Sequence, residues 1–498
     1  MGQWHFEEVW RYRVALWNGM LTTVYLNTLV VLVGTALGML LAVLRLSPAR
    51  PVRYVARAYV DLFRSLPLLV LLVWFFFALP YLTGLRFRLE AFPAAVLGLS
   101  LNLSAFVAEI ARAGIEAVPA YHVEAGRVAG FTPWQTWRHI TGPIAFRLMT
   151  PPLFGQYINQ IKLSVLASVI AVPELLHVVN TITTETFRPL ELYTTLAVIF
   201  LAMLLPATWL QAHLESRSAV GDESANRDPA PCSDQVGLKQ REKTLLETVE
   251  QLSESWPVLP GGSRLVAQEL RCGYNGRVVL QQVSLVALQG AVTTLVGSNG
   301  SGKTTLLRCL CGILPSQSGA MYLCLGDGTV GEQSSSSVGY MSQEHEPWPH
   351  LTVGENLTLP LRIVRGLGRA EAEKEAENWL RLMGLENRTN DRPSELSGGQ
   401  RQRLVFARTL CLRPRMLFLD EPTSAMDSAW TLMVQRIIRK LSGQGVLIVT
   451  VSHSLAFLRS STDTVVCLDH GTIAEVGAAS EAVGHPKSEA LRTFLEVA

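Results

Sequence analysis

The chain has 498 residues, of which 49% are hydrophobic and only 17% are charged, against about 25% charged residues in an average soluble protein. Its formal net charge of +2 is too small to attract nucleic acid or another polyanion. All seven cysteines lie after residue 230 without a paired C-x-x-C spacing, which argues against a disulfide framework and a cysteine-based metal site.

Apolar residues gather in five stretches within the first 210 residues. A helix needs about 20 mostly apolar residues to cross the hydrocarbon core of a membrane, and five such stretches in so short a segment argue against buried helices of a soluble protein. They cover residues 19–44, 66–82, 91–111, 153–173 and 194–210. We therefore expect an all-α transmembrane domain of about five helices over residues 1–214.

Arginine is unevenly distributed among the segments that join these stretches. Residues 45–65 are rich in arginine, and the segment after the third stretch carries Arg127, Arg138 and Arg147. Because cytoplasmic loops hold more Arg and Lys than external ones, we expect the amino terminus outside the cell. The loop over residues 123–143, and everything after the fifth stretch, should then lie in the cytoplasm.

Polar residues recur at intervals of about three or four within the fourth stretch, a spacing that stacks side chains along one side of a helix. They are Gln156, Asn159, Gln160 and Lys162. A lysine deep in a membrane costs about 2.5–3.5 kcal/mol on insertion scales, so it should face protein or water. These four residues and Asn102 are candidates for a solute pathway; hydrogen bonding between helices is the alternative interpretation.

A polar segment rich in Ser, Pro and charge covers residues 215–263 and is typical of a tether. Beyond it, "VTTLVGSNGSGKTTLLRCL" offers an apolar strand, a glycine loop and a helix start, and its Gly297, Gly302, Lys303 and Thr304 fit the G-x-x-x-x-G-K-[ST] phosphate loop. Backbone N–H groups of such a loop hold phosphate oxygens, the lysine reaches the outer phosphates and the hydroxyl ligates Mg²⁺. We expect an α/β P-loop domain over residues 264–498 that binds a nucleotide.

Two acidic residues follow a second apolar strand, in "RMLFLDEPTSAMD". Asp420 at the strand tip can hold the Mg²⁺ shell, and Glu421 can polarise the attacking water, as phosphoryl transfer requires. Together with the phosphate loop, they predict nucleotide hydrolysis.

The stretch "LSGGQRQR" (396–403) resembles the signature of ATP-binding cassette (ABC) proteins, and further motifs between residues 265 and 480 fit that family in order. The resemblance implies that adenine stacks on Tyr274, that Gln343 senses Mg²⁺ and the membrane partner, and that His453 contacts the terminal phosphate. The ATP-binding residues that it implies are Tyr274, Gly297, Ser298, Asn299, Gly300, Ser301, Gly302, Lys303, Thr304, Thr305, Ser397, Gly398, Gly399, Gln400 and Asp427.

The same resemblance implies which residues bind Mg²⁺ and which take part in catalysis. Mg²⁺ would be served by Thr304, Gln343 and Asp420, and catalysis by Glu421, His453 and Gln343. In that family the signature of one copy closes over the phosphate loop of another. The resemblance therefore implies a homodimer, in agreement with the commonness of twofold pairs.

The loop "VEAGRVAGFTPWQTWRHITGP" (123–143, hereafter the coupling loop) resembles the EAA loop of bacterial binding-protein-dependent import permeases. Glu124, Ala125 and Gly130 match that motif. Such loops form two short helices that dock on the cassette near Gln343, and Trp134 or Trp137 is a candidate anchor.

The permease region is similar to the polar amino acid uptake family, in "YVDLFRSLPLLVLL" and "LNLSAFVAEIARAGIEAVPAYHVEAGRVAGF". The resemblance implies an importer of amino acids in the bacterial inner membrane, working with an extracytoplasmic solute-binding protein. Two alternatives are an exporter of a small solute and a membrane-anchored ATPase that transmits force without transport.

Overall fold

The computed structural model describes residues 7–82, 89–223, 256–274, 276–331 and 338–497. Its contacts divide the chain into two compact units. The first unit comprises residues 1–118 and 142–221, and the second comprises residues 119–141 and 222–498. Most of the coupling loop therefore belongs, by its contacts, to the unit that carries the phosphate loop.

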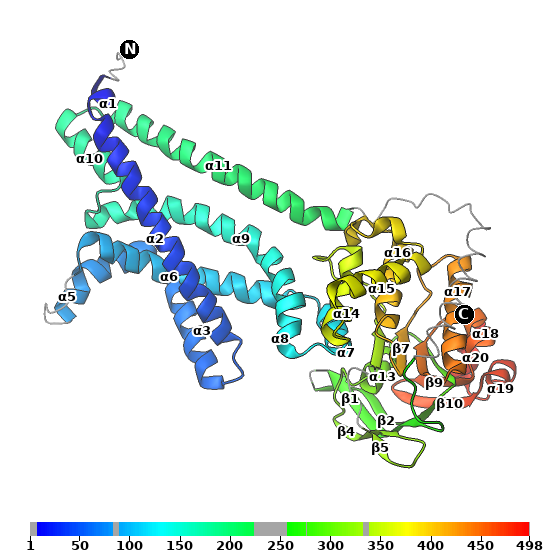
Figure 1. The fold of residues 1–498 in the computed structure, drawn as a ribbon. Helices are drawn as coiled ribbons and strands as arrows, with labels where there is room; N and C mark the ends of the chain where they lie inside the picture. Colours follow the sequence, from blue (N-terminus) through cyan, green and yellow to red (C-terminus); the bar gives the residue numbers. More distant parts are fainter. Residues whose placement is uncertain (1–6, 83–88, 224–255, 275, 332–337, 498) are drawn as a thin grey trace. The chain divides into compact units, whose positions relative to one another are not determined.

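The described part of the first unit is helical throughout (Figure 1). Two of its elements are irregular turns, a π turn (η1) and a 3₁₀ turn (η3). The elements are α1 (Glu7–Arg11), α2 (Arg13–Arg45), α3 (Arg50–Ser65), α4 (Leu68–Val73), η1 (Trp74–Ala78), α5 (Leu79–Leu82), α6 (Ala91–Glu116), α9 (Gly142–Leu163), η3 (Ser164–Ile170), α10 (Leu175–Thr186) and α11 (Pro189–Glu223).

Three of the described helices are long and apolar enough to cross a membrane without a break: Arg13–Arg45, Ala91–Glu116 and Pro189–His213. They contain the first, third and fifth predicted stretches. The second and fourth stretches fall in helix pairs bent by 104° and 48°, so the number of spans reaches five only if each bent pair counts as one. The fourth stretch is not one continuous α-helix, because α9 gives way to η3 at Ser164 and the turn ends at Ala171 with φ of 61°.

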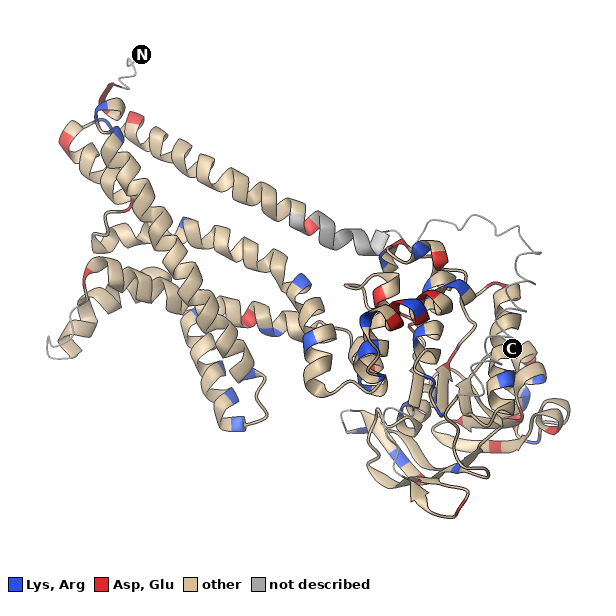
Figure 2. Ribbon diagram, viewed as in Figure 1, with Lys and Arg blue, Asp and Glu red and all other residues tan. Residues whose placement is uncertain are grey.

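Small residues let α2 and α6 approach closely. A Cβ built on Gly38 of α2 would lie 2.6 Å from Cβ of Val107 and 2.8 Å from the carbonyl oxygen of Ser104, both on α6. A Cβ on Gly34 would lie 2.9 Å from Leu103. Such contacts replace the hydrophobic effect as the source of helix association in lipid, where packing and hydrogen bonds hold helices together. Figure 2 shows few charged residues along α2 and α9.

The second unit contains two sheets. Strands β2-β1-β4-β5 form an antiparallel sheet, and strands β10-β9-β3-β8-β7-β6 form a sheet that is parallel except for β10. The bounds are β1 (Arg264–Tyr274), β2 (Arg277–Leu288), β3 (Val292–Val296), β4 (Ser318–Cys324), β5 (Val330–Gly331), β6 (Val338–Met341), β7 (Met416–Asp420), β8 (Leu447–Val451), β9 (Thr464–Asp469) and β10 (Thr472–Ala478). Strands β3, β7 and β8 are buried at every residue, as parallel strands covered on both faces are.

The second unit also contains helices, of which α14, α15 and α16 lie together (Figure 1). The helical elements are α7 (Ala120–Val128), α8 (Pro133–Thr136), η2 (Trp137–Thr141), α13 (Lys303–Leu310), α14 (Val353–Val364), α15 (Arg369–Leu382), η6 (Glu386–Arg388), η7 (Pro393–Glu395), α16 (Gly398–Leu410), α17 (Ser428–Gly443), α18 (Leu455–Ser461), α19 (Ala479–Gly484) and α20 (Glu489–Val497). The largest core cluster joins α14, α15, α16 and α17 to β7 and β8.

The predicted tether, residues 215–263, is divided in the structure. Helix α11 continues to Glu223, and residues 224–255 lie outside the described part. From Trp256 the chain packs on the second unit, since the Trp256 side chain is buried and its Nε1 donates to the carbonyl oxygen of Pro414 at 2.9 Å.

Candidate active site

The phosphate-loop sequence folds into a tight turn between β3 and α13. Gly297, Gly300 and Gly302 have φ of 137°, 81° and 102°, values that residues with a Cβ rarely adopt. A Cβ on Gly297 would lie 2.2 Å from the carbonyl oxygen of Leu468, and one on Gly302 would lie 2.7 Å from Leu280. The glycines therefore allow a turn that directs backbone N–H groups toward the start of α13, where an anion is stabilised.

Lys303 folds back over this turn. Its Nζ donates to the carbonyl oxygens of Gly297 at 2.9 Å and Ser298 at 2.8 Å, and its side chain is buried. Burial lowers the pKa of Lys303, while the nearby carboxylates of Glu421 and Asp420 act to raise it. The ammonium group is thus held in place by two carbonyl groups within a polar cavity, where a phosphate can compete for it.

Asp420 ends β7 in a fully buried position, at 1% exposure. Its side chain is hydrogen-bonded to Thr304, which lowers its pKa, but burial is the larger effect and the pKa is raised. Its Oδ2 is buried without a hydrogen-bond partner among the described residues. A carboxylate oxygen left without a donor, beside a hydroxyl group, offers the hard oxygen ligands that Mg²⁺ prefers. The residues present therefore fit a magnesium ion.

Glu421 follows with φ of 52°, an unusual value for a residue other than glycine. Its Oε1 lies 3.4 Å from Nε2 of His453. Burial, with a further contribution from Asp420, raises the pKa of Glu421 to about 7. Burial and the charge of Lys303 lower the pKa of His453. This pair thus places a carboxyl group poised to accept a proton near neutral pH next to a neutral imidazole.

These groups converge on one cavity of about 250 Å³. Its lining residues are Val279, Asn299, Gly300, Gly302, Lys303, Thr304, Thr305, Gln343, Asp420, Glu421, Val451 and His453. A neighbouring cavity of about 710 Å³ continues over Gly297 and Ser298 to α20. Ser301 is buried within the phosphate loop. The structure therefore brings together the phosphate-loop residues, the two acids, Gln343 and His453.

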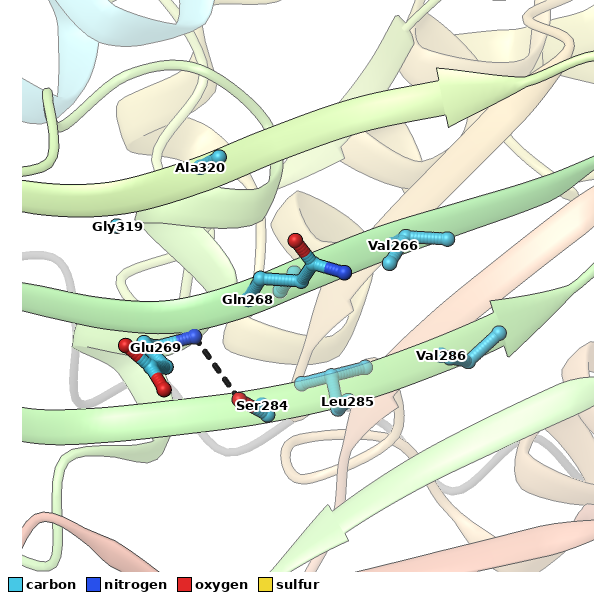
Figure 3. Close-up of a pocket in the computed structure, with 9 residues that line it drawn as sticks. Val266, Gln268, Glu269, Ser284, Leu285, Val286, Gly319 and Ala320 are labelled. Carbon is cyan, nitrogen blue, oxygen red and sulfur yellow. Dashed lines mark hydrogen bonds between the residues drawn. The ribbon is translucent and has the colours of Figure 1, made fainter.

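A larger cavity of about 790 Å³ lies elsewhere, on the antiparallel sheet (Figure 3). Glu269 is the single titratable residue among those that line it, and its backbone N–H donates to Oγ of Ser284 at 2.9 Å. With no convergent catalytic groups on its walls, this cavity is a poor candidate for the active site.

The signature residues do not line the cavity around Lys303. Ser397 instead caps α16, accepting from the Gln400 backbone N–H at 3.3 Å while Gln400 Oε1 accepts from the Ser397 N–H at 2.9 Å, and Gly398 and Gly399 form the first turn of that helix. Asp427 caps α17 by accepting from the Trp430 N–H at 2.9 Å. Tyr274 ends β1, interacts with Arg308 and is 40% exposed.

Helix α7, which begins just before the coupling loop, and η2 within the loop both contact the rest of the second unit. Trp348 Nε1 donates to the carbonyl oxygen of His122 at 3.3 Å, and His350 Nε2 donates to that of His139 at 2.7 Å. The Phe131 ring centroid lies 5.8 Å from that of Trp348. Trp348 is fully buried, which makes it the centre of the contact.

Residues of the EAA motif contribute in different ways. Glu124 forms an ion pair of 3.6 Å with Arg308 on α13, Ala125 is half-buried, and Gly130 has φ of 98° at the turn that follows α7. The candidate anchors, Trp134 and Trp137, stack on each other, with centroids 5.3 Å apart, and are 64% and 49% exposed; their anchoring role stays a prediction. Their rings cover one another, while the buried aromatic position is taken by Phe131.

Family comparisons agree with this geometry. Residues 280–424 match the family described as ABC transporter, and residues 34–220 match the family described as binding-protein-dependent transport system inner membrane component. Glutamine transport ATP-binding protein GlnQ of Escherichia coli (strain K12) is 38% identical over 223 residues, which are 44% of this chain and 92% of that protein. This chain belongs to the ABC transporter family.

Other relatives of this ABC transporter match the same half of the chain. The octopine permease ATP-binding protein P of Rhizobium meliloti is 37% identical over 44% of this chain and 88% of its own length. A solved structure titled "Crystal structure of an amino acid ABC transporter with histidines" is 32% identical over 43% of this chain and 100% of that chain, with a TM-score of 0.41. The predicted fold class, a helical permease domain followed by an α/β ATPase domain, is confirmed, and the chain is a transport ATPase that carries its permease.

Several residues of this ABC transporter were not predicted from the sequence. Trp348 and Phe131 at the coupling loop are two of them; another is Arg408, whose guanidinium lies 4.3 Å from the centroid of the Trp348 ring. A tryptophan in the otherwise polar stretch "QEHEPWPHLT" was the one available signal. Gln402 and His345 form a buried junction behind Glu421, described below. Their spacing in the sequence gives no signal that would distinguish them from neighbouring residues.

The candidate pathway residues do not share one environment. Asn159 and Lys162 are exposed on α9, whereas Gln160 is fully buried and its amide atoms have no hydrogen-bond partner among the described residues. Gln156 is partly exposed. Asn102 is buried and donates to the carbonyl oxygen of Phe63 at 2.9 Å, which supports a structural role for it.

Proposed function

We propose that this ABC transporter imports amino acids across the bacterial inner membrane, driven by ATP hydrolysis at the cavity around Lys303 and Glu421. The observation that carries the proposal is the coupling loop: a segment of the permease sequence, bearing the EAA-like residues of importers, packs on the ATPase domain through Trp348, His350 and Arg308. The proposed domains are the permease over residues 1–214, a linker over 215–263 and the ATPase domain over 264–498.

The proposed roles in hydrolysis follow from the environment of each group. Lys303 and the N–H groups of residues 297–305 bind the phosphates, and Tyr274 binds adenine. Thr304, Gln343 and Asp420 would hold Mg²⁺, whose charge neutralises phosphate oxygens when it is bound. Glu421 orients the attacking water and accepts its proton, for which a pKa near 7 is suited. His453, held neutral at its side, contacts the terminal phosphate.

A second copy of the chain is part of the proposal. Ser397, Gly398, Gly399, Gln400 and Asp427 lie outside the cavity of their own chain, and the first turn of α16 leaves backbone N–H groups that can meet the nucleotide of a partner. Two copies would also double the number of spanning helices around a pathway, in contact with membrane lipid. Asn159 and Lys162, exposed on α9, are its proposed solute-facing residues.

The proposed solute class rests on the relatives. Their names include glutamine, cystine and arginine transport, and the permease part resembles the polar amino acid uptake family. An extracytoplasmic solute-binding protein is proposed as a further partner, because the permease region matches the inner membrane component of binding-protein-dependent systems.

Uptake of an isotope-labelled amino acid mixture tests the proposal. Cells expressing the chain and its binding protein are compared with cells expressing Glu421→Gln, at equal amounts of protein in the membrane. Selective accumulation that the variant abolishes is the expected result. Selective depletion of the cells would instead establish export, and ATP hydrolysis without movement of any solute would favour an ATPase that only transmits force.

A further inference from the structure

Both polar atoms of the Gln402 side chain, on α16, form hydrogen bonds behind the active site. The side chain is fully buried. Its Oε1 accepts from the backbone N–H of Ala425 at 3.0 Å, and its Nε2 donates to the carbonyl oxygen of Glu421 at 3.0 Å. A backbone N–H can only donate and a carbonyl can only accept, so these two contacts fix the orientation of the amide.

His345 completes the junction. Its Nε2 lies 3.0 Å from Nε2 of Gln402 and 3.3 Å from Oγ of Ser424. Because the amide nitrogen can only donate, the imidazole nitrogen facing it must accept, which requires a neutral ring with its proton on Nδ1. The hydrogen-bond geometry alone therefore makes the His345 ring an acceptor for Gln402.

The junction fixes the backbone of Glu421 on both sides. The Glu421 N–H donates to the carbonyl oxygen of Val451 at 3.1 Å, and its carbonyl oxygen accepts from Gln402 and, at 3.3 Å, from Ser424. Its φ of 52° is strained for a residue other than glycine and persists only where the surroundings enforce it. Gln402 therefore supplies part of the restraint that keeps Glu421 in this conformation.

The same amide joins segments with different tasks. α16 starts at the signature, residues 424–427 lead into the Asp427 cap, and His345 follows Gln343 by two residues. Gln402 lies on α16 and hydrogen-bonds to the other two segments through Ala425 and His345. A movement of any of the three segments therefore changes the hydrogen bonds at the Glu421 carbonyl.

We propose that Gln402 is a positioning residue for ATP hydrolysis, which holds the main chain of Glu421 in its catalytic conformation and, through His345 as its acceptor, ties Glu421 to the signature helix and to residues 424–427. This inference rests on the proposed function, in which Glu421 activates water and the start of α16 faces the nucleotide of a second copy.

Steady-state ATP hydrolysis by the full-length transporter in lipid nanodiscs tests the role of Gln402. Gln402→Ala is expected to lower kcat at least about tenfold and to leave KM for ATP within about twofold, because the phosphate-binding groups are untouched. His345→Phe keeps an aromatic ring but removes the acceptor, and a loss of about threefold in kcat is expected. The double variant should be no slower than Gln402→Ala alone, since residues in one network are not additive.

Thr409→Val is the matched control. Thr409 lies on the same helix, is buried, and donates to the carbonyl oxygen of Val405 at 2.9 Å within that helix. Its replacement should leave kcat unchanged. The inference is overturned if Gln402→Ala keeps kcat within about twofold, or if Thr409→Val loses as much activity at an equal fall in melting temperature.

Two further measurements keep the outcome decisive. If Gln402→Ala does not fold, His345→Phe alone decides: a lower kcat at unchanged KM supports the inference, and an unchanged kcat overturns it. Glu421→Gln is assayed in parallel. An active Glu421→Gln overturns the proposed function itself, whereas an inactive Glu421→Gln beside a fully active Gln402→Ala overturns only the role of Gln402.

Discussion

Glu124 of the coupling loop and Arg308 of α13 form an ion pair of 3.6 Å. Arg308 stands five residues after Lys303 on the helix that begins at the phosphate loop, so the pair joins the segment from the permease sequence to the element that would bind nucleotide. Both side chains are about four-fifths buried, at 19% and 20% exposure. Loss of the Glu124 carboxylate leaves Arg308 with the more distant Glu344, at 4.0 Å, as its paired carboxylate. Weakening a buried pair in this way costs more than the loss of an exposed pair.

Glu124→Gln should therefore weaken coupling more than hydrolysis. We expect uptake to fall about five- to tenfold, corresponding to 1.0–1.4 kcal/mol, while the basal ATPase rate stays within about twofold. Paired assays in proteoliposomes measure the ratio of amino acid uptake to ATP hydrolysis. Exchange of the charges, in Glu124→Arg with Arg308→Glu, should recover part of it; equal losses of uptake and hydrolysis in Glu124→Gln would contradict a coupling role.

The pH profile of ATP hydrolysis should fall on its acidic side, because Glu421 becomes protonated there. Its pKa is about 7 because of burial and the neighbouring Asp420, and only the ionised carboxylate can accept a proton. We expect kcat/KM for ATP to fall about tenfold per pH unit below pH 7 and to level off above it.

The fall on the acidic side should not reflect unfolding caused by this group. A raised carboxyl pKa means that the folded state binds the proton more tightly than the unfolded state, so Glu421 contributes stability below its ordinary pKa of 4.5 and loses it as pH rises to about 7. Melting temperatures recorded across the same pH range provide the check. A rate that stays constant between about pH 6 and 8 would refute the assignment of Glu421 as the base.

Trp348→Ala and Trp134→Ala should have opposite outcomes. Trp348 is fully buried between the coupling loop and Arg408, and truncation of a buried tryptophan costs about 3–5 kcal/mol. Trp134 is 64% exposed and contacts Trp137, so its truncation should change stability by less than about 1 kcal/mol. Melting temperature and the ratio of uptake to hydrolysis are the measurements. A larger effect of Trp134→Ala than of Trp348→Ala would identify Trp134 as the anchor.

Complementation tests whether two copies build each nucleotide site. Chains with Lys303→Ala and chains with Ser397→Arg should each be inactive alone. Co-expression should restore part of the activity, because a mixed pair retains one site with an intact Lys303 on one chain and an intact Ser397 on the other. ATP hydrolysis by the purified pair, selected through two different tags, gives the answer. Absence of any recovery would indicate that Ser397 serves its own chain.

Local sequence determined the positions of the apolar stretches, the phosphate loop and the two acidic residues. The positions of the apolar stretches follow from composition, since about 20 apolar residues are what a membrane requires, and the phosphate loop follows from glycines whose backbone freedom no other residue shares. Asp420 and Glu421 were predicted because they end an apolar strand. In each case the deciding interactions lie within a few residues of each other along the chain.

Only the tertiary structure decided which residues meet from distant segments. It placed Phe131 and Trp348 at the coupling contact, left Trp134 exposed, and bent the helix pairs that carry the second and fourth apolar stretches. It also buried Gln160 while leaving Asn159 and Lys162 exposed. It also joined Gln402 to His345 across 57 residues. Burial, partner and pKa depend on atoms contributed by elements far apart in the sequence, and the spacing of residues within one segment carries no record of them.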